Sequence, residues 1–163
     1  MSVNRYRPHV LVIPEDRADE QIANGFVLHD QVKHRQIQVL PCAEGWSGVL
    51  HAFTTEYIPY LRNYQQGYVV LLIDFDGNYQ IRRNDFEVSI PDDLKDRTFV
   101  IGASETPELL RQSLNEDWET IGLSLADECY KDTCLLWGHE QLKHNEPDRL
   151  RLLRHVKSVL FGA

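Results

Sequence analysis

Short apolar runs alternate along the chain with longer segments in which apolar side chains recur every three or four positions. The apolar runs predict four strands, at residues 9–13, 36–40, 68–74 and 97–103. The periodic segments predict helices at residues 15–33, 47–64, 106–116, 117–130 and 148–161. Pro59 predicts an irregularity in the middle of the second helix. Segment 68–74 is almost entirely apolar, which is typical of a strand that is buried on both faces of a sheet.

The regular alternation of strands and helices predicts the fold class. It indicates an α/β fold, Rossmann-like, with a central, mainly parallel sheet of about four strands and helices on both faces. Segment 68–74 is too apolar for an edge strand, so we expect it in the interior of the sheet. A length of 163 residues fits one domain, 1–163, whose C-terminal helical segment covers about 117–163.

Composition narrows the class of protein. Hydrophobic residues make up 42% of the chain and charged residues 26%, which is ordinary for a globular protein. No apolar run approaches the ~18 residues that a membrane span needs, so we expect no membrane partner. Cys42, Cys129 and Cys134 contain no Cys-x-x-Cys pair and are typical of reduced thiols. These features, with a polar N-terminus, predict a cytoplasmic protein.

The net charge of −8 bears on the partners that the chain can bind. It excludes a surface that is basic throughout, which a protein that binds nucleic acid over its whole surface would need. It remains compatible with a small basic patch, or with contact to nucleic acid through metal ions. One basic stretch lies in the predicted C-terminal helix and contains Arg149, Arg151, Arg154, His155 and Lys157. It indicates either a surface for a protein partner or a second copy, or a solvated helix face whose cations suit the helix dipole.

Acidic side chains follow every predicted strand, at the edge of the sheet where α/β folds bind ligands. They are Glu15 and Asp16, Glu44, Asp74 and Asp76, and Glu105 and Glu108. Helix capping is enough to explain Asp16, Glu44 and Glu108. Asp74 and Asp76 differ, because residues i and i+2 of a strand point the same way and their charges would repel. A bound cation or a shared proton would relieve that repulsion, although a plain Asp-x-Asp-Gly turn is an alternative.

Two segments, "VLVIPE" (10–15) and "LLIDFD" (71–76), resemble the Toprim domains of topoisomerases, primases and overcoming-lysogenization-defect nucleases. In that family a first strand ends in glutamate and a later strand ends in Asp-x-Asp. "PCAEGWSGVL" (41–50) is similar to the glycine-bearing loop after the second strand of the nuclease-like members. The resemblance extends over about residues 8–115.

The resemblance implies a Toprim-like fold and a metal-dependent nuclease-like hydrolase, or another nucleic-acid-processing domain. Glu15, Asp74 and Asp76 would be its catalytic residues and would bind Mg²⁺, or Mn²⁺ in its place, with Glu15 acting as base or as a further ligand. Asp19 lies four residues after Glu15, on the same face of the predicted helix, and would be an additional metal ligand.

Two other functions fit the same motif. "VVLLIDFDGN" (69–78) also resembles the first motif of haloacid-dehalogenase-type phosphatases, with Asp74 as nucleophile and Asp76 as acid/base. That chemistry needs a lysine near Asp74, and Lys95 is the candidate closest in sequence. The third interpretation is a Toprim-like interaction module without catalysis, which needs no metal. A Toprim enzyme, in contrast, requires Glu15 close to the two aspartates.

Overall fold

The computed structural model describes residues 2–162, in which four parallel strands form one sheet of order β2–β1–β3–β4. The strands are β1 (His9–Pro14), β2 (Ile37–Val39), β3 (Gly67–Leu72) and β4 (Thr98–Ile101). The predicted α/β fold with a parallel central sheet of about four strands is confirmed. So is the interior position of segment 68–74, since β3 lies between β1 and β4.

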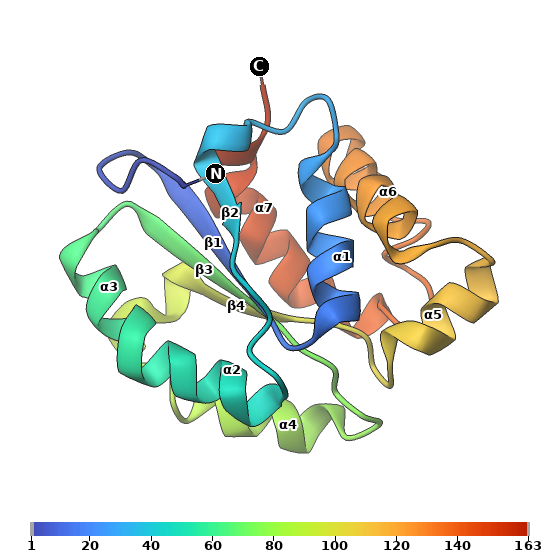
Figure 1. Ribbon diagram of the computed structural model, residues 1–163, viewed down its shortest axis with the longest axis horizontal. Coiled ribbons are helices and arrows are strands. Elements are labelled where there is room, and N and C mark those ends of the chain that lie inside the picture. The colour runs from blue at the N-terminus through green and yellow to red at the C-terminus, as the bar shows by residue number, and fades with distance from the viewer. Residues whose placement is uncertain (1, 163) are drawn as a thin grey trace.

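Helices cover both faces of this sheet (Figure 1). One face carries α1 (Arg17–Val27), α5 (Pro107–Leu114), α6 (Trp118–Lys131) and α7 (Glu146–Leu160). The other carries α2 (Trp46–Ala52), α3 (Ile58–Asn63) and α4 (Tyr79–Glu87). A π-helical segment, Phe53–Tyr57, joins α2 to α3 and is the irregularity that Pro59 predicted. No helix within residues 2–162 has the length and apolar character needed to cross a membrane.

The central strands contribute side chains to two separate cores. Val10 and Val12 of β1 are buried against the face that carries α1, α6 and α7. Leu11 and Ile13 are buried against the face that carries α2, α3 and α4. Successive side chains of a strand point to opposite faces, so a strand covered on both sides has to be apolar at every position. This requirement explains the continuous apolar runs of the sequence.

Two features of the helices differ from the prediction. The first helix ends at Val27 instead of continuing to residue 33, and a short 3-10 helix, His34–Gln36, leads into β2. Helix α4 was not predicted, because its sequence is mostly polar and Phe86 is its one fully buried side chain. The missed helix matters for function, since α4 begins directly after the Asp-x-Asp motif.

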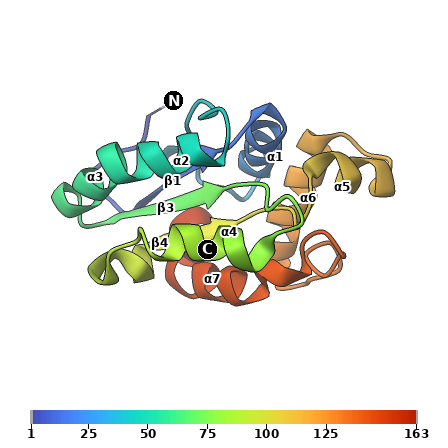
Figure 2. The same cartoon turned by 90° about the horizontal axis from the view of Figure 1, so that it is seen from below.

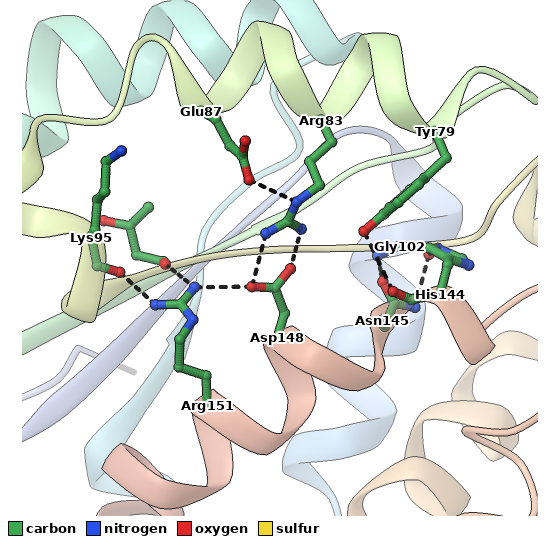
Figure 3. A network of polar contacts seen from close by, with 10 residues as sticks. Tyr79, Arg83, Glu87, Lys95, Gly102, His144, Asn145, Asp148 and Arg151 are labelled. Carbon is green, nitrogen blue, oxygen red and sulfur yellow. Dashed lines mark hydrogen bonds and ion pairs between the residues drawn. The ribbon is translucent and has the colours of Figure 1, made fainter.

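Helix α7 covers the outer edge of β4 with polar side chains (Figure 3). Arg151 donates to the carbonyl oxygens of Lys95 and Thr98, and Asn145 bonds both the N–H and the carbonyl of Gly102. These bonds satisfy some of the backbone groups that the β4 edge would otherwise offer to another chain: the carbonyl of Thr98 and both backbone groups of Gly102, which follows the strand.

The same helix is joined to α4, which covers the opposite face, at the β4 edge of the sheet, where the two helices come close together (Figure 2). Asp148 accepts hydrogen bonds from Arg83 of α4 and from Arg151 of α7. Further along α7, Arg149 pairs with Glu146 and Lys157 with Asp132. Much of the basic stretch that indicated a partner surface is therefore engaged within the chain itself.

Candidate metal centre

The acidic residues of the first and third strands meet at the carboxyl end of the sheet. Strands β1 and β3 pair in register up to Pro14 and Leu72, and the N–H of Glu15 continues the ladder with a bond to the carbonyl of Leu72 (2.8 Å). The backbone N–H of Asp74 then donates to the Glu15 carboxylate (3.0 Å). Parallel pairing of two adjacent central strands thus holds Glu15 against Asp74, as the sequence predicted.

A third carboxylate joins them from the start of α1. Asp16 is the N-cap of that helix, and its side chain accepts a hydrogen bond from the N–H of Asp19 (3.2 Å). Carboxylate oxygens of Glu15, Asp16 and Asp74 lie within 4.8 Å of one another. Asp16 is therefore a helix cap, as expected, and also a member of the cluster. Glu15 and Asp74 are 8% and 5% exposed, so their carboxyl groups are held close together and largely out of water.

Asp19 lies next to Asp74, and its side chain is 1% exposed. Within residues 2–162, Asp19 Oδ2 and Asp74 Oδ1 are buried oxygens that no donor reaches. Buried polar atoms without a partner are rare and costly. A proton shared between the two carboxyl groups, which would hydrogen-bond one to the other, or a bound cation would satisfy these oxygens.

The pKa values of the cluster reflect this crowding. Burial raises the pKa of Asp74 to about 8; the charges of Asp16 and Glu15 add to the effect, whereas the hydrogen bond with Asp19 opposes it. Burial, followed by the charge of Asp74, raises the pKa of Asp19 well above its usual range. Burial also raises the pKa of Glu15, although the N–H of Asp74 opposes the shift. Without a bound cation the cluster therefore retains a proton at neutral pH, and a cation would have to displace it.

Asp76 lies apart from this cluster. The strand ends at Leu72, and Asp76 and Gly77 both have positive φ angles (51° and 76°) in a turn that is closed by a bond from Asn78 N–H to Phe75 O (2.8 Å). An Asp-Gly pair is well suited to such a turn. The prediction that Asp74 and Asp76 point the same way along a strand is therefore wrong: Asp74 is buried, whereas the Asp76 side chain is 47% exposed.

The side chain of Asp76 is held instead by Arg82 of α4. The Arg82 guanidinium bonds Asp76 Oδ2 (3.2 Å) and lies 4.1 Å from the ring centroid of Trp46, at the start of α2. Both side chains are near enough to act on Glu15. The charge of Asp76 raises the pKa of Glu15, and the charge of Arg82 lowers it. Sequence reasoning missed Arg82 and Trp46 because neither belongs to the acidic motif and α4 was not predicted.

The remaining candidates do not belong to the cluster. Glu108 pairs with Arg111 on α5, and Glu105 is exposed. Lys95 precedes β4, at the opposite end of the sheet from Asp74, and its ammonium group pairs with Asp92 (3.3 Å). The phosphatase interpretation consequently lacks the lysine that it required.

Comparisons of the chain with protein-family models, with curated proteins and with solved structures return no match. The chemistry open to the acidic cluster has to be inferred from its own residues.

Proposed function

We propose that the protein is a Toprim-like domain that binds Mg²⁺ at the cluster of Glu15, Asp16 and Asp74 and acts on phosphodiesters of nucleic acids. The observation that carries the proposal is the buried, unpartnered Oδ1 of Asp74, beside two further carboxylates within 4.8 Å. Nothing in a purely structural turn requires a carboxylate oxygen to be buried without a donor.

The residues of the cluster fit a small hard cation. Mg²⁺ binds oxygen ligands and keeps several of its waters, so two or three carboxylates are sufficient. Mn²⁺ accepts the same ligand types and is expected to replace it. The buried Asp19 would act either as a further ligand or as the partner that orients Asp74.

Each side chain then has a distinct task. A bound divalent ion would stabilise negative charge on a phosphate and lower the pKa of an attacking water. Glu15 is oriented by the N–H of Asp74, and its raised pKa suits it to accept a proton. Asp16 is fixed by its role as helix cap. Asp76, a ligand in the Toprim pattern, can join the site only if its ion pair with Arg82 opens.

One observation favours a second candidate function. The ion pair between Arg82 and Asp76 neutralises one of the three carboxylates that catalysis in the Toprim pattern would use. A Toprim-like interaction module that binds a metal without cleaving nucleic acid, or binds none, is consistent with that pairing.

Cleavage assays combined with thermal melting separate these candidates. Labelled single-stranded and duplex oligonucleotides are incubated with the protein in Mg²⁺, Mn²⁺ or EDTA. The wild type is compared with Asp74→Asn and with a control, Asp93→Asn, whose exposed carboxylate pairs with Arg62 away from the cluster.

The proposal expects metal-dependent cleavage and a metal-dependent rise in melting temperature for wild type and control, and neither for Asp74→Asn. A rise in melting temperature without cleavage would favour the interaction module. If neither metal affects the wild type, the cluster is not a metal centre.

A further inference from the structure

A second surface lies at the opposite end of the sheet from the acidic cluster. It consists of Arg5, Tyr6, Tyr57, Tyr60 and Tyr64, and we refer to it as the tyrosine–arginine patch. Figure 1 shows how it is assembled: the N-terminal segment and the end of α3 lie together beyond the start of β1, away from the loop between β1 and α1. No residue of the patch belongs to the acidic cluster.

The aromatic rings of the patch form one connected surface. The ring centroids of Tyr60 and Tyr64 are 4.7 Å apart, and those of Tyr57 and Tyr60 are 6.0 Å apart. Tyr6 meets the edge of Tyr64 with a centroid distance of 5.8 Å and remains 77% exposed. The guanidinium of Arg5 lies 5.5 Å from the centroid of the Tyr64 ring and 5.9 Å from that of Tyr60.

Hydrogen bonds fix the position of this surface. His9 is buried at the start of β1, and its Nδ1 must donate to the carbonyl of Arg7 (2.7 Å). Its Nε2 is then the acceptor for the Tyr60 hydroxyl (2.7 Å). The side chain of Gln66 donates to the carbonyl of Tyr6 (2.9 Å). The Tyr60 ring and the backbone of Tyr6 are therefore held in place before any ligand arrives, which lowers the entropic cost of binding.

A hollow of about 370 Å³ adjoins the rings. Tyr57, Tyr60 and Arg5 line it together with the polar side chains of Gln38 and Glu56. Its volume is within the range of small-molecule sites, and its lining combines aromatic faces with hydrogen-bonding groups. A single planar ring system such as a nucleobase matches this combination.

The N-terminal segment of the patch is positively charged, in contrast to the whole chain, while the carboxylate of Glu56 lines the adjoining hollow. Residues 2–8 contain Arg5 and Arg7 and no carboxylate, in a protein with a net charge of −8. Within residues 2–162 neither arginine forms an ion pair, whereas Arg62 nearby pairs with Asp93. Arg97 donates to the carbonyls of Leu61, Tyr64 and Gly67 and so holds the loop before β3. Arg7, and Arg5 apart from its hydrogen bond to the Tyr64 hydroxyl (3.4 Å), therefore have no carboxylate partner in the described part of the chain and can meet an anionic ligand.

We propose that the tyrosine–arginine patch binds single-stranded nucleic acid, with unpaired bases stacked on Tyr6 and its neighbours and with Arg5 and Arg7 at the phosphates. Exposed aromatic rings beside a few cations are the means by which proteins bind single strands without sequence readout. In a duplex the bases are already paired and stacked on one another, so they are not accessible to the tyrosine rings. The surface is separated from the acidic cluster by the length of β1, roughly 20 Å at about 3.3 Å per residue.

Fluorescence anisotropy with labelled oligo(dT) tests the proposal, in EDTA so that the metal centre plays no part. The variants are Tyr6→Ala, Tyr6→Phe and Arg5→Ala. The matched control is Arg111→Ala, which removes another arginine that lies over an aromatic ring (5.0 Å from the Trp118 centroid), on α5. Melting curves confirm that each variant is folded.

The wild type should bind oligo(dT) more tightly than a duplex of equal length. Tyr6→Ala should lower the affinity about fivefold or more, as expected for one lost stacking contact, while Tyr6→Phe retains it. Arg5→Ala should reduce the slope of log affinity against log salt by about 0.7, the value for one phosphate contact on a single strand. Arg111→Ala should change neither property.

Equal binding of duplex, equal losses in Arg5→Ala and Arg111→Ala, or no binding by the wild type would each overturn the proposal. Because metal is absent from the assay, such a result would leave the metal centre as it stands. Conversely, loss of metal binding at the acidic cluster would not bear on nucleic-acid binding by the tyrosine–arginine patch.

Discussion

Substitution of Asp19 by asparagine is the perturbation that most directly probes the crowded carboxylates. In the wild type, a shared proton bridges the buried Asp19 Oδ2 and Asp74 Oδ1 near neutral pH, and these oxygens have no donor among the described residues once that proton is lost at alkaline pH. An asparagine side chain is nearly the same size and brings an N–H₂ group that can donate to Asp74. Asp19→Asn should therefore stabilise the protein at alkaline pH in the absence of metal.

The gain in the free energy of unfolding at alkaline pH is the difference between two opposing effects. Giving a donor to a buried, unsatisfied acceptor contributes about 1–3 kcal/mol. Loss of a negative charge near the start of α1 costs about 0.3–1 kcal/mol. The net gain is about 1–2 kcal/mol, and at about 2–4 °C per kcal/mol for a chain of this size it corresponds to a rise of about 2–8 °C in melting temperature.

The gain should also depend on pH. The carboxyl of Asp74 has a pKa of about 8 in the folded protein, whereas an unfolded aspartate titrates near its ordinary value, so between these limits the folded state binds more protons. The free energy of unfolding of the wild type therefore falls as pH rises through this window. Asp19→Asn removes one of the carboxylates that crowd Asp74. The stability gained by the variant over the wild type should therefore be larger near about pH 9 than near about pH 5.

Thermal melting in EDTA at both pH values measures this difference. Asp117→Asn is the control, because asparagine caps a helix as well as aspartate and the Asp117 cap of α6 is exposed. A melting temperature for Asp19→Asn below that of the wild type at alkaline pH would refute the reasoning. So would a shift that is the same at both pH values.

Three further substitutions have expected outcomes. Asp76→Asn should change stability by less than about 1 kcal/mol, since it breaks a partly exposed ion pair, and it should weaken Mg²⁺ binding less than Asp74→Asn does, as metal titrations followed by melting would show. Asp148→Asn should destabilise the protein by about 3–5 kcal/mol in urea unfolding, because Arg83 and Arg151 would lose a buried carboxylate whose side chain is 3% exposed. Gly102→Ala should cost at least about 1–3 kcal/mol in the same assay, because a Cβ there would lie 1.5 Å from the carbonyl oxygen of Ile73.

Most of the fold could be predicted because its strands are buried on both faces. That burial makes β1 and β3 continuously apolar, and the segments between them are long enough to be helices. The boundaries that were missed depend on contacts between distant residues. Gly102 follows β4, and its backbone bonds with Asn145, 43 residues away. Helix α4 escaped prediction because its Arg83 docks on Asp148 of α7, a contact that leaves no periodic apolar pattern.

The candidate site could be predicted only in part, for a similar reason. Strand order places Glu15 beside Asp74, and the apolar runs of the sequence place both residues at the carboxyl ends of strands, although β3 ends two residues earlier than predicted. The direction of the Asp76 side chain could not be predicted, because it depends on the positive φ angles of the Asp76–Gly77 turn. The approach of Asp19 to Asp74 depends on how α1 packs on the sheet. The repulsion assigned to Asp74 and Asp76 from sequence therefore lies between Asp74 and its neighbours Asp19, Asp16 and Glu15.

Isothermal titration of Mg²⁺ into the protein, repeated in two buffers that differ in ionisation enthalpy, tests the metal centre most directly. The cluster should bind Mg²⁺ saturably and release up to about one proton near neutral pH, because the proton held by Asp19 and Asp74 has to leave. Binding should be lost in Asp74→Asn and retained in Asp93→Asn. Absence of saturable binding in the wild type, or unchanged binding in Asp74→Asn, would contradict a metal centre at the ends of β1 and β3.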